Sequence, residues 1–161
     1  MRPWSFGLAL GVAGVMISSL LIWWLASSDT SFSDRWLTVA ILLPLGGVYL
    51  GWDRQKKVAA ASPEEQQALP SRATYIVMAA LLAGLTQYLT FIIASSIWNA
   101  DMIDPSQSGF FHHLFNPNSL PGLSSRGSGG TTESDWIGMT LIGIVVGALM
   151  MFYITRTPKA Q

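Results

Sequence analysis

The chain has 161 residues, of which 50% are hydrophobic and only 11% are charged, and its nine basic and nine acidic residues cancel. A soluble domain usually carries about 25% charged residues, so this chain has too little charge to cover a globular surface in water, and a bilayer is the alternative solvent. The balanced charge gives no indication of nucleic-acid binding, and the absence of cysteine excludes disulfide exchange, thiolate metal sites and a cysteine nucleophile.

Four apolar stretches without Asp, Glu, Lys, Arg or His follow one another along the chain, at residues 4–26, 36–52, 74–98 and 136–154. A membrane-spanning helix needs about 20 apolar residues. The second stretch is the shortest, but "DRQKKV" can continue it as helix. The predicted spans are therefore residues 4–26, 36–58, 74–98 and 135–155, joined by a connector at 59–73 and a loop at 99–134. We expect an all-α fold, a four-helix transmembrane bundle that forms one domain over residues 1–161.

The first two stretches each carry a local feature that affects this expectation. The first stretch has a possible cleavage site, "ASS" at 26–28, but its apolar run is longer than the 7 to 15 residues of a signal peptide, so we expect a retained span. In the second stretch Pro44 predicts a kink, because proline removes one backbone hydrogen bond of the helix.

Tryptophans gather at the ends of these stretches. Their rings favour the membrane interface, where one edge is apolar and the N–H is hydrated. We predict interfacial anchoring by Trp23, Trp24, Trp36, Trp52, Trp98 and Trp136.

The basic residues predict the orientation. One side of the membrane would hold Arg2, Arg54, Lys56, Lys57, Arg72, Arg156 and Lys159, and the other only Arg35 and Arg126. Lysine and arginine stay on the cytoplasmic side, so we expect a multi-pass protein of the bacterial inner membrane with both termini in the cytoplasm. The loop at 99–134 would then be extracytoplasmic.

Each predicted span contains small residues four positions apart. Helices in a membrane associate through close packing of such residues, because lipid is as apolar as leucine. The candidate packing residues are Gly7, Gly11, Gly14 and Ser18 in the first span, Gly47 and Gly51 in the second, Ala80 and Gly84 in the third, and Gly143 and Gly147 in the fourth. These seams would join helices within one chain or between chains, and the intramolecular arrangement is the simpler expectation.

The sequence indicates no catalytic residue. Proton-coupled transport and haem binding between helices need titratable or histidine side chains at membrane depth, and the four stretches contain none. Polar side chains of the third stretch remain as candidates for a pore lining: Thr86, Gln87, Thr90, Ser95 and Ser96. Hydroxyls and amides on one helix are more often contacts between helices than a path, so a small oligomeric channel or carrier is the second alternative.

Both histidines lie in "FFHHLF" at residues 110–115, between two prolines of the long loop. A helix of about two turns fits here, with Phe110, Phe111, Leu114 and Phe115 in the acyl boundary and the imidazoles at the headgroups. Adjacent histidines on a helix point about 100° apart, whereas helical metal pairs are spaced four apart. We therefore expect a short interfacial helix and no cofactor. Metal or pigment binding through His112 and His113 is a third alternative.

This layout resembles that of small bacterial four-span membrane proteins of unknown function. The shared features are a glycine-bearing first span, a second span that ends in "LGWDRQKK", a polar connector, an outer loop and a short basic tail. The resemblance implies no catalytic residues. Together these features predict a non-enzymatic protein that contacts the lipid bilayer and binds other membrane subunits or itself, as an accessory, scaffold or assembly subunit of a larger complex.

Overall fold

The computed structural model describes residues 2–28, 39–61, 69–98, 100, 103, 109–120 and 132–156, and of residues 132–134 only the backbone. These residues form four long helices, α1 (Pro3–Ser28), α3 (Leu42–Ala61), α4 (Arg72–Trp98) and α7 (Thr132–Ile154), and two short ones, α5 (Phe110–Phe115) and the 3-10 helix η3 (Pro117–Ser119). The prediction of an all-α helical bundle is confirmed.

Three of the long helices are long and apolar enough to cross a membrane: Pro3–Ser28, Arg72–Trp98 and the Asp135–Ile154 part of α7. Helix α3 has 20 residues, but its second half carries Asp53, Arg54, Lys56 and Lys57. Its described apolar part, residues 42–52, would extend only about 16 Å at 1.5 Å per residue. The expected start of this span at residues 36–38 lies outside the described residues.

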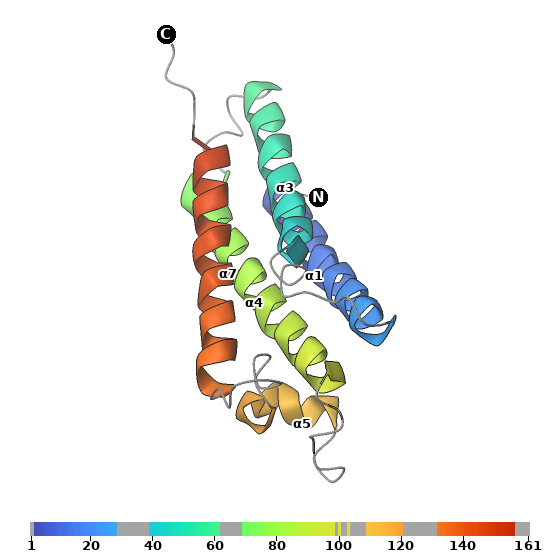
Figure 1. Ribbon diagram of the computed structural model, residues 1–161. Coiled ribbons are helices and arrows are strands. Elements are labelled where there is room, and N and C mark those ends of the chain that lie inside the picture. The colour runs from blue at the N-terminus through green and yellow to red at the C-terminus, as the bar shows by residue number, and fades with distance from the viewer. Residues whose placement is uncertain are drawn as a thin grey trace.

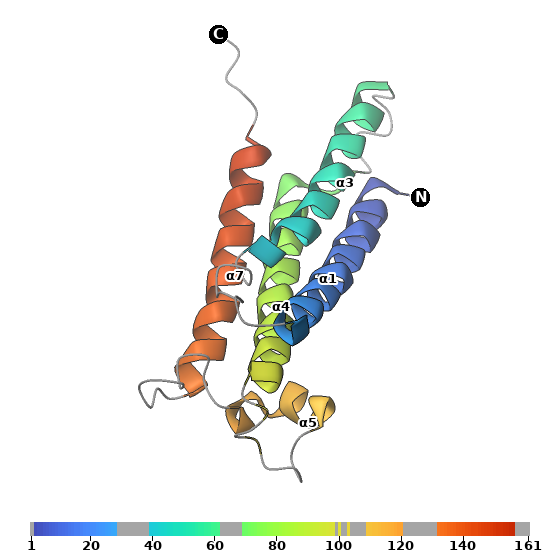
Figure 2. The ribbon, with the colours of Figure 1, turned by 45° about the vertical axis from the view of Figure 1, so that its right-hand side comes forward.

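The long helices form two pairs, α1 with α3 and α4 with α7 (Figure 1). Helix α4 joins the pairs because it packs against α1, α3 and α7, and half of its apolar window is buried. Helix α7 packs chiefly against α4. Helix α1 begins and α7 ends at one end of the bundle, and α5 lies across the opposite end (Figure 2).

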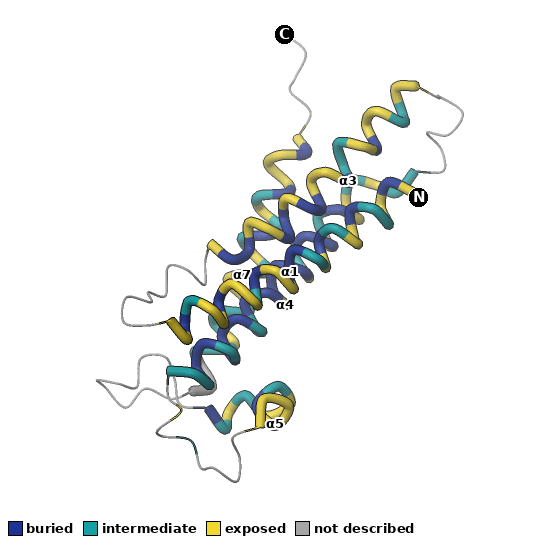
Figure 3. The backbone as a smooth tube through the Cα atoms, turned by 90° about the vertical axis from the view of Figure 1, so that its right-hand side faces the viewer, coloured by how far each residue is buried: buried dark blue, intermediate teal, exposed yellow. Residues whose placement is uncertain are grey.

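The hydrophobic core lies between the paired helices, around α4. Its largest cluster gathers around Tyr75, Ala79 and Ala83 of α4, with Val48 of α3 and Met151 of α7. A second cluster lies where α4 meets the α5–η3 segment and contains Phe91, Ile92 and Leu120. Many residues on the outward faces of the long helices are exposed, yellow in Figure 3, and large apolar side chains are frequent among them. An apolar exterior around a well-packed interior is the surface expected of a protein in lipid.

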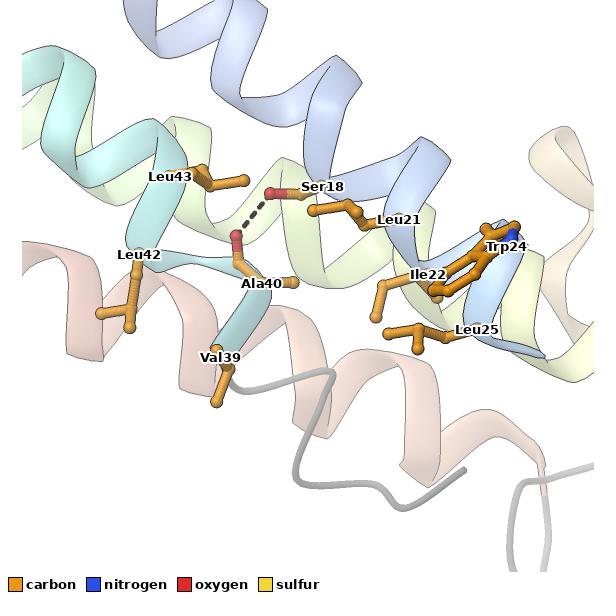
Figure 4. A pocket seen from close by; sticks show the side chains of 9 residues that line it. All are labelled: Ser18, Leu21, Ile22, Trp24, Leu25, Val39, Ala40, Leu42 and Leu43. Carbon is orange, nitrogen blue, oxygen red and sulfur yellow. Dashed lines mark hydrogen bonds between the residues drawn. The ribbon is translucent and has the colours of Figure 1, made fainter. Parts of the chain in front are cut away.

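The expected disturbance at Pro44 takes the form of a break just before α3. Residues 39–40 are helical, Ile41 is a turn, and α3 begins at Leu42. Proline has no N–H, so the carbonyl of Ala40, four residues earlier, loses its usual helical donor. The hydroxyl of Ser18 on α1 donates to this carbonyl over 2.6 Å (Figure 4). A buried serine thus replaces the bond that Pro44 cannot make.

Candidate functional site

The seam between α1 and α3 is a direct contact of glycine backbones. A Cβ on Gly47 would lie 2.5 Å from the backbone N of Gly11, and one on Gly51 would lie 2.5 Å from the Cα of Gly7. A Cβ on Gly14 would lie 2.6 Å from the N of Pro44. No side chain fits at these three positions without moving a backbone. The candidate residues of the first two spans therefore meet one another within this chain.

In the seam between α4 and α7, the glycines of α7 meet the backbone of α4, whereas the glycine of α4 meets a side chain. A Cβ on Gly143 would lie 2.7 Å from the carbonyl oxygen of Ala83, and one on Gly147 would lie 2.7 Å from that of Ala79. Gly84 faces the flexible side chain of Ile144. The alanines that receive α7 are therefore Ala79 and Ala83, both fully buried, whereas the candidate Ala80 is only partly buried. Ala79 and Ala83 are also four apart in the sequence, on the same helix face as Thr86 and Thr90.

Four of the five polar residues of α4 that were candidates for a pore lining are buried inside the bundle, and the fifth, Ser96, is partly buried. The Thr86 hydroxyl donates to the carbonyl of Leu82, and the Thr90 hydroxyl donates to that of Thr86. Both side chains, with Gln87 and Ser95, are at most 1% exposed. Threonine hydroxyls bonded to their own helix have no proton left to donate to a passing solute, so this row favours packing over conduction.

An apolar groove of about 480 Å³ lies beside the break that precedes α3 (Figure 4). It runs between the last turns of α1 and residues 39–43, and Leu21, Trp24, Leu25, Val39 and Leu43 are among its walls. Its polar contributor is Ser18, whose hydroxyl is engaged with Ala40. The groove therefore offers dispersion contacts and no directional polar group.

The α5–η3 segment, residues 109–120, is a cap held against the ends of α4 and α7. The Tyr88 hydroxyl of α4 donates to the carbonyl of Leu114, over 2.5 Å. The indole N–H of Trp136 on α7 donates to Oδ1 of Asn118, over 2.8 Å. Leu120 is 1% exposed and packs in the same cluster as Tyr88 and Trp136. One side chain from each of two spans therefore fixes the cap.

His113 lies inside this cap, fully buried, and its tautomer follows from its neighbours. The Ser119 hydroxyl donates its only proton to the carbonyl of Asn116, over 2.6 Å. Its oxygen lies 2.8 Å from Nδ1 of His113, so it must accept there, and Nδ1 carries the proton of the neutral imidazole. Nε2 is then a bare acceptor, and it is buried without a hydrogen-bond partner among the described residues. Burial, and to a lesser degree the neighbouring His112, lower the pKa of His113 below its usual 6.5.

The two histidines have different environments, which the sequence did not predict. His112 is exposed, whereas His113 is buried, so the expectation of two imidazoles at the headgroups is wrong for His113. Their ring planes are 79° apart. In the described part of the chain, no three histidine or acidic side chains could share a metal ion.

The predicted aromatic anchors also differ from one another in their exposure. Phe110, Phe111 and Phe115 are 41%, 73% and 83% exposed and can reach lipid from the outer face of the cap, while Leu114 turns partly inward. Trp23 and Trp24 are exposed at the same end of the bundle, and Trp36 lies outside the described residues. The remaining three, Trp52, Trp98 and Trp136, are partly buried. Trp52 packs edge to face with Tyr75, so it contributes to the contact between α3 and α4.

The basic end of the bundle contains contacts that no sequence pattern predicts. Arg72, at the start of α4, donates from Nε to the Thr155 hydroxyl and from Nη2 to the carbonyl of Phe152, where α7 ends. A cation at a helix C-terminus is stabilised by the helix dipole. Arg54 of α3 lies 4.8 Å from the ring centre of Phe6 on α1. Arg72 and Arg54, whose charges predicted the orientation, thus also link neighbouring helices.

Comparisons of the chain with protein-family models, with curated proteins and with solved structures give no match. The resemblance to small bacterial four-span proteins stays a prediction, and the function is inferred from the geometry of the chain itself.

Proposed function

We propose that this chain is a non-catalytic membrane protein that serves as an accessory, scaffold or assembly subunit of a larger complex in the bacterial inner membrane. The observation that carries the proposal is an apolar strip on α7. Helix α7 packs chiefly against α4, and its far side presents a row that is 43–61% exposed: Ile137, Leu141, Val145, Leu149 and Phe152. Residues spaced by four and three lie on one face of a helix. A partner helix can pack along this face.

A small residue beside the strip supports the same proposal. A Cβ on Gly138 would meet nothing within 4 Å, so no described residue packs against this glycine. Small residues let helix backbones approach closely in a membrane. The buried threonines of α4 and the lack of titratable side chains in the apolar stretches favour this role over the alternative of an oligomeric channel or carrier.

Photo-cross-linking from two adjacent valines tests the proposal. Val145 is 53% exposed, whereas Val146 packs against the core. A photoreactive amino acid at Val145 should give, in intact cells, one saturable adduct with another membrane protein, and the same group at Val146 should give none. Adducts only with lipid at Val145 would refute the subunit role, and an adduct of twice the 17.5 kDa mass of the chain would favour the homo-oligomer instead.

The proposed orientation places both termini in the cytoplasm and the cap outside. Because the chain has no cysteine, single cysteines report topology without background. Ala60, near the end of α3, and Asn116, in the cap, are both exposed. We expect an impermeant maleimide to label Asn116→Cys in spheroplasts, and Ala60→Cys only after the membrane is opened. The reverse pattern would invert the proposed orientation.

A further inference from the structure

The cap is closed by a histidine that must stay neutral. Its Nδ1–H is engaged with Ser119, and its Nε2 lies buried with no partner among the described residues. A second proton would enter at Nε2 and would create a buried cation whose new N–H has no acceptor. Burying such a charge without a partner is costly. The docked cap therefore does not accommodate a protonated His113, and the charged imidazole must leave its buried site.

We propose that the α5–η3 segment is a pH-sensitive latch, docked on α4 and α7 while His113 is neutral and released when Nε2 takes up a proton. The remaining fastenings are few. Among the described residues they are the bond from Tyr88 to Leu114, the bond from Trp136 to Asn118 and the apolar contacts of Leu114 and Leu120. Helix α5 has six residues and exposes three phenylalanines to the outside, so the released segment can remain at the membrane surface.

Among the described side chains, no other titratable group on the packed elements forms an ion pair with His113. Tyr88 on α4 donates to the carbonyl of Leu114, His112 on α5 is itself a base, and η3 has no titratable side chain. Asp135 is the first residue of α7 whose side chain is described. Its Oδ2 is buried without a hydrogen-bond partner among the described residues. It forms no ion pair with the imidazole, since Lys57–Asp53 is the pair found in the described part of the chain.

The direction of the pH effect follows from linkage. The docked cap holds His113 with a pKa below its usual 6.5, so the released cap binds more protons than the docked one. Docking is then strongest above the pKa of the released imidazole and weakens as the pH falls below it, until the pH has passed the lowered pKa of the docked state. Within that window the ratio of released to docked molecules rises about tenfold for each pH unit.

Distance measurements between spin labels test the latch. Cysteines that replace Phe115 in the cap and Tyr153 at the far end of α7 are both at exposed positions, and labelling is completed at pH 8 before the pH is changed. In lipid nanodiscs we expect one narrow distance distribution at pH 8 and a second, broad one that gains at least fivefold in population at pH 5.5. An unchanged distribution at pH 5.5 would overturn the latch.

Three variants identify the group that titrates. His112→Gln and Asp135→Asn should keep the pH response of the parent, while His113→Gln should abolish it. A response that persists in His113→Gln, or that disappears in Asp135→Asn, would refute the assignment to His113.

A spectroscopic measurement covers the case in which His113→Gln does not dock at all. The chain has two histidines, so His112→Gln leaves His113 as the single imidazole. Its ¹⁵N spectrum should show Nδ1 protonated and Nε2 bare at pH 8, and its titration should coincide with the appearance of the broad distance distribution. An Nε2-protonated tautomer, or a titration that does not coincide with release, would overturn the proposal.

Discussion

Replacing Gly47 with alanine should separate α1 from α3 and lower the free energy of unfolding by about 1–3 kcal/mol, as overpacking does in other tightly packed interiors. The added Cβ would lie 2.5 Å from the backbone N of Gly11 and from the carbonyl carbon of Leu10. Neither atom belongs to a side chain that can rotate away, so one helix must shift. Thermal unfolding in mild detergent measures the loss.

The neighbouring residue supplies a matched control. A Cβ on Gly46 would meet nothing within 4 Å, although it is the same residue type on the same helix. Gly46→Ala should therefore be neutral or stabilise the chain by up to about 1 kcal/mol, because alanine favours helix. Equal losses from Gly46→Ala and Gly47→Ala would show that any methyl group on this helix is harmful and that the seam has no special role.

Candidate seams can be read from the sequence because membrane packing leaves a simple pattern. Spacing of four places small residues on one helix face, and in lipid such faces are where backbones meet. It could not predict which seams pair, since the glycines of α1 suit any helix with a small face. The pairing of α1 with α3 becomes evident only from the contact of Gly14 with Pro44 and of Gly51 with Gly7.

The cap shows where sequence reasoning fails. "FFHHLF" has one apolar face and two polar side chains, which indicates an interfacial helix, and the exposed phenylalanines agree with it. The burial of His113 depends on Ser119 and on Tyr88, 25 residues earlier in the chain, and no local pattern connects them. A tertiary contact thus decides which of two adjacent, chemically identical side chains is inside.

Replacing Ser18 with alanine should destabilise the chain by about 1–3 kcal/mol, the cost of leaving a buried acceptor without its donor. Ser18 is 1% exposed, and its hydroxyl donates to the carbonyl of Ala40. Hydrogen bonds between membrane helices average only about 0.6 kcal/mol, because most lost bonds find substitutes. Here the usual substitute is missing, since Pro44 has no N–H to offer. Ser19→Ala is the matched control, because the Ser19 hydroxyl bonds to Val15 within its own helix and should be worth less than about 0.5 kcal/mol.

Pro44→Ala should remove the need for Ser18. An alanine at position 44 restores a backbone N–H four residues after Ala40, so that carbonyl regains a helical donor. The loss caused by Ser18→Ala, measured by unfolding in mixed micelles, should then fall by about 1 kcal/mol or more in the Pro44→Ala background, which is the coupling expected of residues that share one acceptor. The same loss in both backgrounds would mean that Ser18 acts only through its small size in the seam. A reduced loss would show that α1 supplies the hydrogen bond that is missing just before α3. The two helices must then assemble together before the backbone at the start of α3 is fully hydrogen-bonded in lipid.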